Sequence, residues 1–195
     1  MTKESVIYAI VGPSGSGKTT LVEELIKKFP FLFYEVISYK TRDKRPDEVE
    51  GVNGYYVSKE EFIKIRNQNI MIAETVYDGH YYGADEGELL PLEEGKSALY
   101  VIDYESIELL KSQVKKIKGH EHTKIIFVYL TIDHDILEAR LRNSGNRSEN
   151  EIKSRIARLS LEHGVMEKAD YIISNNSRDT NDMVRQFIVN VFIKE

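Results

Sequence analysis

The sequence predicts an α/β fold in which a parallel sheet lies between two layers of helices, with a small antiparallel insertion and a helical lid. Two observations lead to this prediction. Short, β-branched apolar segments alternate with amphipathic helical patterns along the chain, as parallel strands joined by helical crossovers require. In addition, a glycine-rich stretch, GPSGSGKTTL, joins the first strand pattern directly to the first helical pattern. Ligands of such folds gather at the carboxyl ends of the strands.

The individual elements follow from the same alternation. Apolar, β-branched segments predict strands at residues 5–11, 34–38, 98–103, 124–130 and 169–174. Helical patterns occupy residues 18–29, 104–118, 133–143, 149–168 and 179–193.

Two segments interrupt the alternation. Residues 42–84 are polar, rich in tyrosine and in turn signals such as Asp78-Gly79, and they contain one short helical pattern, KEEFIKI. The segment RLRNSGNRSENEIKSR joins two helices through an arginine-rich loop, which is typical of a lid. We therefore expect one domain over residues 1–195, with a core of 1–38, 85–135 and 165–195, a substrate-binding region of 39–84 and a lid of 136–164.

The composition narrows the functional classes. The 195-residue chain has a formal net charge of −5 at pH 7, which disfavours a general nucleic-acid binder because that role needs a basic surface. It contains no cysteine, which excludes disulfides and thiolate metal sites. No apolar stretch approaches membrane-spanning length. We interpret the apolar N-terminal segment as a core strand, not as a signal peptide. We expect a cytoplasmic protein that acts on small molecules, as a monomer or a homodimer.

The glycine-rich stretch carries the strongest chemical signal. Gly12, Gly17, Lys18 and Thr19 match the spacing G-x4-G-K-[ST] of a phosphate-binding loop. Backbone N–H groups of such a loop surround phosphate oxygens, and the following helix adds the positive end of its dipole. Lys18 would reach the β- and γ-phosphates, and the Thr19 hydroxyl would bind Mg²⁺. The simpler alternative is a glycine-rich turn beside an exposed lysine.

Arg42 and Arg45 follow the second predicted strand. Two arginines three residues apart, near a phosphate loop, could bind a second phosphate through bidentate hydrogen bonds. Acidic neighbours such as Asp43 and Glu48 support the alternative of a solvated surface charge run, and the residues alone leave the two readings open.

A second group of arginines lies in the predicted lid. Phosphoryl transfer spreads negative charge over the equatorial oxygens, and lid arginines can stabilise that charge on closure. We favour this role for Arg140 and Arg155. For Arg142 and Arg158 we favour surface ion pairs with glutamates such as Glu138 and Glu149.

Three further side chains are candidates for substrate or metal binding. Asp103 ends a buried strand, where a carboxylate can orient substrate or water on Mg²⁺, although it would also serve as a helix N-cap. Glu74 and Tyr82 lie in a hairpin pattern, where a carboxylate could read a purine edge and a phenol could hold a phosphate. Simple strand alternation with exposed polar residues explains the pair equally well.

The motifs taken together resemble a known family. GPSGSGKTTL, SYKTRDKR with EVEGV, DGHYYG, YVIDYES and a lid that ends in Arg155 follow one another in the order found in guanylate kinases, over roughly residues 6–176. The resemblance implies a phosphate-loop core, a small antiparallel GMP-binding region and a lid. It also implies the Mg²⁺-dependent reaction of ATP with GMP to give ADP and GDP.

The resemblance implies roles for individual residues. ATP would contact Gly12, Ser14, Gly15, Ser16, Gly17, Lys18, Thr19 and Thr20, with Asn175 near its adenine. GMP would contact Ser38, Arg42, Arg45, Tyr55, Glu74, Tyr82 and Asp103. Lys18, Arg42, Arg140 and Arg155 would act on the transferring or acceptor phosphates, and Thr19 and Asp103 would serve the metal.

The chain departs from the family pattern at three substrate-binding positions. Gly54 stands where the family usually has a phosphate-binding tyrosine, and the adjacent Tyr55 is a candidate substitute. If residues are counted back from YYG without a gap, Ala73 falls at the position of the guanine-reading glutamate. Ala84, directly after YYG, stands at the position of a guanine-reading hydroxyl. Loss of such hydrogen-bonding groups relaxes or redirects the choice of base.

These departures keep other functions open. A kinase of another monophosphate, or of a ribose bisphosphate, would need no guanine pocket. A non-catalytic binding module of the guanylate-kinase-like type typically lacks a working phosphate loop, whereas this loop is intact. A GTPase or ATPase switch would need a motif such as NKxD, which this sequence does not contain.

Overall fold

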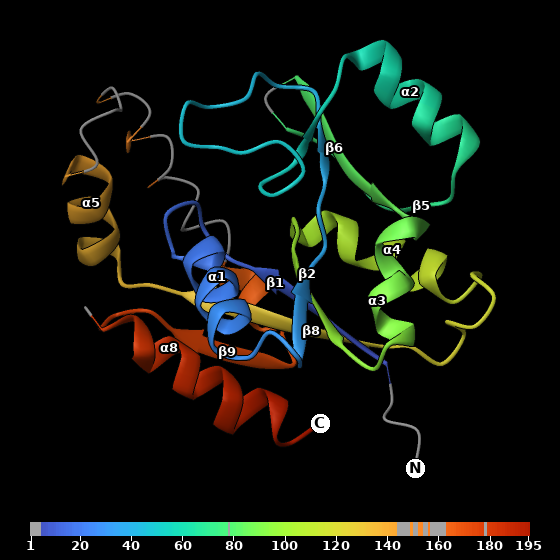
Figure 1. Ribbon diagram of the computed structural model, residues 1–195. Coiled ribbons are helices and arrows are strands. Elements are labelled where there is room, and N and C mark those ends of the chain that lie inside the picture. The colour runs from blue at the N-terminus through green and yellow to red at the C-terminus, as the bar shows by residue number, and fades with distance from the viewer. Residues whose placement is uncertain are drawn as a thin grey trace. The chain divides into compact units, whose positions relative to one another are not determined.

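The computed structural model describes residues 5–77, 79–143, 149, 152–153, 156, 163–177 and 179–195, and it confirms the predicted α/β class (Figure 1). A five-stranded sheet has the order β2-β7-β1-β8-β9. Its strands are β1 (Val6–Val11), β2 (Phe33–Glu35), β7 (Ser97–Val101), β8 (Lys124–Thr131) and β9 (Tyr171–Ser174). All of β1 is buried. Its sequence is nearly continuously apolar, as in parallel strands of which both faces are covered.

The helices follow the predicted alternation with shorter bounds. They are α1 (Lys18–Lys28), α3 (Leu90–Glu93), α4 (Ile107–Val114), α5 (His134–Asn143), α7 (His163–Met166) and α8 (Thr180–Phe187), with short 3₁₀ turns η1 (Glu86–Leu89) and η2 (Tyr104–Ser106) and a π-helical end, η3 (Ile188–Phe192). The helix predicted at 104–118 therefore ends at Val114, and half of the one predicted at 149–168 lies outside the described residues. Helix α8 packs against α1 and β9 (Figure 1).

A second sheet, of order β4-β3-β6-β5, forms in the segment predicted as an insertion. Its strands are β3 (Tyr39–Lys40), β4 (Tyr55–Tyr56), β5 (Met71–Tyr77) and β6 (His80–Asp85), with helix α2 (Lys59–Gln68) between β4 and β5. Strands β5 and β6 form the predicted antiparallel hairpin. Strands β3 and β4 are instead parallel, because the residues that connect them, 41–54, are long enough for a crossover.

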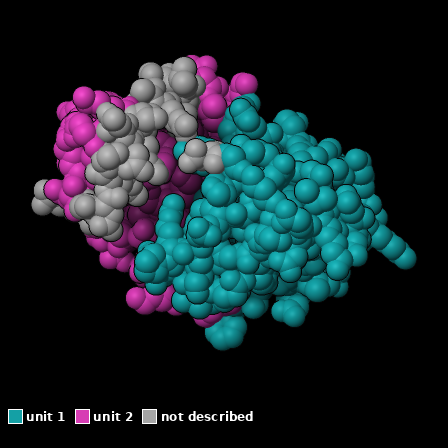
Figure 2. All heavy atoms as spheres, turned by 90° about the horizontal axis from the view of Figure 1, so that it is seen from above, with its two compact units in different colours: residues 1–8, 31–125 teal, residues 9–30, 126–195 magenta. Residues whose placement is uncertain are grey.

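Contacts divide the chain into two compact units, coloured separately in Figure 2. Unit 1 comprises Met1–Tyr8 and Phe31–Ile125 and contains the second sheet with α2 and α4. Unit 2 comprises Ala9–Pro30 and Ile126–Glu195 and contains the glycine-rich corner with α1, α5 and α8. Among the described residues, no helix is both long and apolar enough to cross a membrane.

At Gly83, strand β6 lies close to both β5 and α2. A Cβ atom at this position would lie 2.7 Å from the carbonyl oxygen of Ala73 and 3.2 Å from the ring of Phe62, which belongs to α2. The absence of a side chain therefore allows the hairpin to pack under α2, with Phe62 itself fully buried.

We expect Gly83→Ala to destabilise the protein by about 1–3 kcal/mol, because a backbone carbonyl cannot move aside as a flexible side chain can. Urea denaturation would measure the change. Gly164→Ala is the matched control, since a Cβ there meets nothing within 4 Å. Equal stability of the two variants would contradict the packing argument.

Candidate active site

The corner between β1 and α1 is built on three glycines in the left-handed region. Gly12, Gly15 and Gly17 have φ angles of 151°, 91° and 97°. A Cβ at Gly12 would lie 2.3 Å from the carbonyl oxygen of Leu130, and one at Gly17 would lie 2.4 Å from the amide nitrogen of Asn175. Glycine is therefore required at both positions for conformation and for space.

Helix α1 begins at this corner with its first N–H groups uncapped by any side chain. Gly17 occupies the N-cap position, and the first turn, which is fully described, contains no acidic residue. Ser14, Thr19 and Thr20 are exposed around it. Because uncapped N–H groups and the helix dipole both favour negative charge, this helix end suits an anion such as phosphate.

Lys18 places a cation within the loop. Its ammonium donates to the carbonyl oxygens of Gly12, at 2.6 Å, and Pro13, at 2.9 Å. The side chain thus folds back over the corner. This geometry is not that of a lysine extended into solvent beside a simple turn.

Asn175 and Arg140 brace the same loop from outside. The Asn175 amide donates to the carbonyl oxygen of the fully buried Ser16, at 2.5 Å. Arg140, in the last turn of α5, donates to the carbonyl oxygens of Asn175 and Ser177, both at 3.1 Å. Asn175 is itself buried, and both ends of its side-chain amide face protein groups. The predicted adenine contact of Asn175 and the predicted lid role of Arg140 stay predictions.

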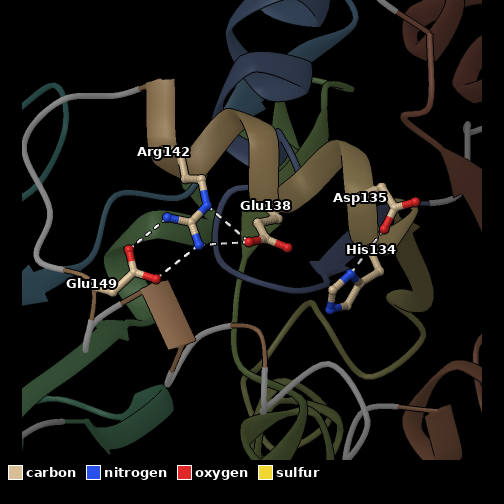
Figure 3. A network of polar contacts seen from close by, with 5 residues as sticks. All are labelled: His134, Asp135, Glu138, Arg142 and Glu149. Atoms are coloured by element: carbon tan, nitrogen blue, oxygen red, sulfur yellow. Dashed lines mark hydrogen bonds and ion pairs between the residues drawn. The ribbon is translucent and has the colours of Figure 1, made fainter.

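Arg142 forms the surface network predicted for it. Its guanidinium binds Glu138, one turn earlier on α5, at 2.8 Å and Glu149 at 2.6 Å (Figure 3). Of the other arginines predicted in the lid, Arg155 and Arg158 lie outside the described residues.

In unit 1, strand alternation sorts the candidate residues onto two faces of the second sheet. Lys40 of β3 is the register partner of both Tyr56 in β4 and Tyr82 in β6, so the three share one face, which we call the Tyr82 face. The opposite face carries Tyr39, Tyr55 and Glu74, and we call it the Glu74 face.

Arg42 joins the Tyr82 face. Its guanidinium lies 5.5 Å from the centre of the Tyr56 ring and forms a bidentate pair with Glu48, with N–O distances of 2.5 and 2.6 Å. Glu48 also accepts from the backbone N–H of the exposed Arg45, at 2.9 Å. The carboxylate therefore fixes Arg42 and the start of the following loop together.

The charges on this face shift one another's titration. Hydrogen bonding to Arg42 lowers the pKa of Glu48 to about 2, and the same bond raises the pKa of Arg42. Burial, with the nearby Glu48, raises the pKa of Tyr56 to about 12. Burial also raises the pKa of Tyr82, although Arg42 opposes that shift. At neutral pH the face thus presents an ion pair between two protonated phenols.

Two predicted substrate-binding residues lie on the Glu74 face. Glu74 forms an ion pair with Arg66 of α2, at 3.1 Å. Tyr55 stacks on Tyr39, with ring centres 5.2 Å apart, and its hydroxyl lies 3.5 Å from a carboxylate oxygen of Glu88. Both side chains therefore point away from Tyr82, because neighbouring residues of a strand face opposite ways.

Ala73 and Ala84 are direct partners in the β5–β6 hairpin and share the face of Tyr82. Both are fully buried. Tyr77 pairs with His80 at the end of the hairpin, and Glu74 lies on the face opposite to Ala73 and Ala84. The ungapped count that assigns these two positions to the reading of guanine stays a prediction.

In unit 1, Ser38 directly precedes β3, and Asp103 follows the end of β7 by two residues. The Ser38 hydroxyl contacts the buried Tyr100 phenol, whose pKa is raised by burial. Asp103 is exposed at the N-cap position of η2 but makes no capping hydrogen bond there. The predicted N-cap position of Asp103 is confirmed, whereas the side-chain capping bond is not formed.

The sequence did not reveal the residues that hold the candidate site of unit 1 in place. It treated Glu48 as a sign of a surface charge run, whereas Glu48 positions Arg42, and it did not single out Tyr56 or Glu88. Glu88 accepts from the Ile37 N–H at 2.7 Å, and burial raises its pKa. The one local signal available in the sequence was that Tyr55 and Tyr56 are neighbours, because neighbouring side chains of a strand face opposite sides of the sheet.

Comparison with known proteins identifies the family. The model of the guanylate kinase family matches residues 4–190. A guanylate kinase of Chlamydia felis is 32% identical over 97% of this chain and 88% of its own, and one of Lactobacillus acidophilus is 33% identical over 91% and 84%. The crystal structure of guanylate kinase from Anaplasma phagocytophilum has the same fold, with a TM-score of 0.73 over 99% of this chain and 87% of that one, at 22% identity.

A loop shaped for phosphate, a separate face with a positioned arginine, and a family match over nearly the whole length agree with one another. The chain belongs to the guanylate kinase family of nucleoside monophosphate kinases.

Proposed function

We propose that this protein transfers the γ-phosphoryl group of ATP to GMP, giving ADP and GDP in purine nucleotide metabolism. The observation that carries the proposal is the left-handed glycine loop at the uncapped start of α1, in a chain of this family. The reaction is direct in-line transfer without a covalent enzyme intermediate, so the protein's contribution is positioning and charge stabilisation.

The phosphate loop and Lys18 bind the triphosphate of ATP. The loop's N–H groups and the dipole of α1 meet the phosphate oxygens, while Lys18 exchanges the carbonyls of Gly12 and Pro13 for the β- and γ-phosphates. Because Gly12 and Gly17 are held against Leu130 and Asn175, the donors keep their directions before ATP arrives.

The residues present also fit Mg²⁺ bound with ATP. Mg²⁺ usually takes one or two protein oxygens together with phosphates and waters. In the described part of the chain no cluster of three or more His, Asp or Glu side chains forms a protein-built site, so the phosphates would supply most ligands. Thr19, exposed in the first turn of α1, offers its hydroxyl, and Asp103 is the carboxylate we assign to metal-bound water. The metal would neutralise charge on the β- and γ-phosphates.

The Tyr82 face binds the acceptor phosphate. Arg42 is already oriented by Glu48, and Arg45 and Tyr82 add donors beside it. Ser38, directly before β3, contributes to the acceptor site. Arg140 and Arg155 stabilise the transferring group, and we place the enzyme in the cytoplasm as a monomer or homodimer.

A second candidate is the phosphorylation of an acceptor other than GMP, such as another nucleoside monophosphate or a ribose bisphosphate. The specific observation in its favour is the buried pair Ala73 and Ala84, which offers methyl groups where a guanine reader would need hydrogen bonds.

The first test is ADP production from ATP and Mg²⁺ with one acceptor at a time: GMP, dGMP, AMP, UMP, dTMP, CMP and ribose 1,5-bisphosphate. We expect the highest kcat/KM with GMP, and ATP hydrolysis without acceptor serves as the blank. Turnover with a different acceptor and none with GMP would replace the first proposal by the second.

Lys18→Ala should lower kcat with GMP by at least about 100-fold, because it removes a preorganised cation from the transferring phosphate. Lys27→Ala is the matched control, since Lys27 lies on the same helix with its side chain 77% exposed. Urea denaturation of both variants would establish that they are folded. A Lys18→Ala enzyme that turned over like wild type would refute the role of the loop.

Arg42→Ala should raise KM for GMP by about tenfold to a hundredfold and leave KM for ATP nearly unchanged, as expected for one lost charged hydrogen-bonding partner. Part of that effect would come from the Glu48 carboxylate left beside the phosphate. The double variant Arg42→Ala/Glu48→Gln separates the two causes, since it should recover the part due to repulsion. If KM for ATP rose instead, Arg42 would not belong to the acceptor site.

A further inference from the structure

Lys40 is a second cation on the Tyr82 face that the family motifs do not single out. Its ammonium lies 5.7 Å from the centre of the Tyr56 ring, and the Arg42 guanidinium lies 5.5 Å from the same ring. Its register partners are Tyr56 and Tyr82, so its side chain leaves the sheet on the side of both phenols. Two cations therefore gather around one aromatic ring.

Gly54 makes the space that Lys40 fills. A Cβ at Gly54 would lie 2.9 Å from both Cδ and Cε of Lys40 and 3.1 Å from its Nζ. Gly54 is not among the glycines with positive φ, so its backbone does not demand glycine. What this position requires is the absence of a side chain beneath the lysine, whose stem lies over Gly54 while its ammonium donates to the carbonyl of Asn53.

This arrangement is costly without an anion. Burial, together with the nearby Arg42, lowers the pKa of Lys40. Glu48 supplies negative charge but is already engaged by both terminal nitrogens, Nη1 and Nη2, of Arg42. An ammonium has three donors, and the Asn53 carbonyl takes one. A phosphate monoester, with up to two negative charges and several acceptor oxygens, is the ligand that satisfies both cations.

We propose that Lys40 binds the phosphate of the acceptor together with Arg42, using the space left by Gly54. The inference rests on the proposed function, since it assigns a further residue to the same acceptor site. It also gives a physical reason for glycine at position 54, because a lysine reaching across from β3 and a large side chain at that position exclude each other.

The test compares Lys40→Met, which keeps the stem and removes the charge, with Lys40→Arg and Lys59→Met. Lys59 is the matched control, because its ammonium also lies 6.0 Å from a tyrosine ring, that of Tyr81, in the same unit. Lys40→Met should raise KM for GMP about tenfold to a hundredfold, the range for one charged hydrogen bond. Lys40→Arg should retain most of the affinity, and Lys59→Met should behave like wild type.

A binding measurement separates phosphate recognition from a structural role. By calorimetry, Lys40→Met should weaken GMP binding by the same factor as KM and leave guanosine binding unchanged. An equal loss for GMP and guanosine would mean that Lys40 only shapes the loop through Asn53 and would overturn the proposal.

Gly54→Ala provides an independent test, since the added methyl group displaces the end of the Lys40 side chain. It should raise KM for GMP in the wild-type background and change it little in the Lys40→Met background. Additive effects of the two substitutions would show that Gly54 does not act through Lys40.

The outcomes distinguish this inference from the proposed function. Wild-type KM for GMP in Lys40→Met would overturn the role of Lys40 while the kinase assignment stood. If wild type used another acceptor of the panel in place of GMP, the proposed function would fail, and the same variants measured with that acceptor would decide on Lys40. If wild type used none of them, both would fall.

Discussion

The close packing of the glycine loop against its surroundings is the constraint on which the nucleotide-binding unit depends. At Gly12 and Gly17 the surrounding atoms leave no room for a Cβ, and one of those neighbours is a backbone carbonyl in β8. Asn175 and Arg140 then link the loop to the residues after β9. A loop fixed in this way holds its N–H donors in one arrangement, so little ordering remains to oppose phosphate binding.

A different constraint, the period of two along a strand, organises unit 1. It places Lys40, Tyr56 and Tyr82 on one face and Tyr39, Tyr55 and Glu74 on the other. The acidic groups near the second face have their own partners: Asp85 accepts from Tyr39 at 3.1 Å, and Glu74 pairs with Arg66. The sheet thus separates a face on which Lys40 and Arg42 outnumber Glu48 from one whose carboxylates are engaged, and the first is the face to which we assign the phosphate.

Local patterns were predictable from the sequence, and register was not. The spacing of Gly12, Gly17 and Lys18 encodes a complete loop, and Arg142 with Glu138 is an i,i+4 pair, so neither needed knowledge of the fold. Glu74 and Tyr55 depended on which way each strand faces, and a one-residue change of register reverses every side chain. A bulge between Met71 and Ala73 contributes to that register and leaves no clear sequence signature. The contact of Asn175 with Ser16 joins residues 159 positions apart, beyond any local pattern.

Glu48 explains how a site with two neighbouring cations can be folded before its ligand arrives. With Lys40 and Arg42 protonated and Glu48 ionised, this group of three carries a single net positive charge. The carboxylate therefore removes much of the repulsion that would otherwise oppose folding, and it does so without blocking the site, because a guanidinium has five N–H donors and a bidentate partner uses two. A neutral ligand gains little from the remaining charge, whereas a phosphate gains from both cations. The acceptor site that we propose would accordingly select first for phosphate, and the buried methyl groups of Ala73 and Ala84 offer no hydrogen bond to a base.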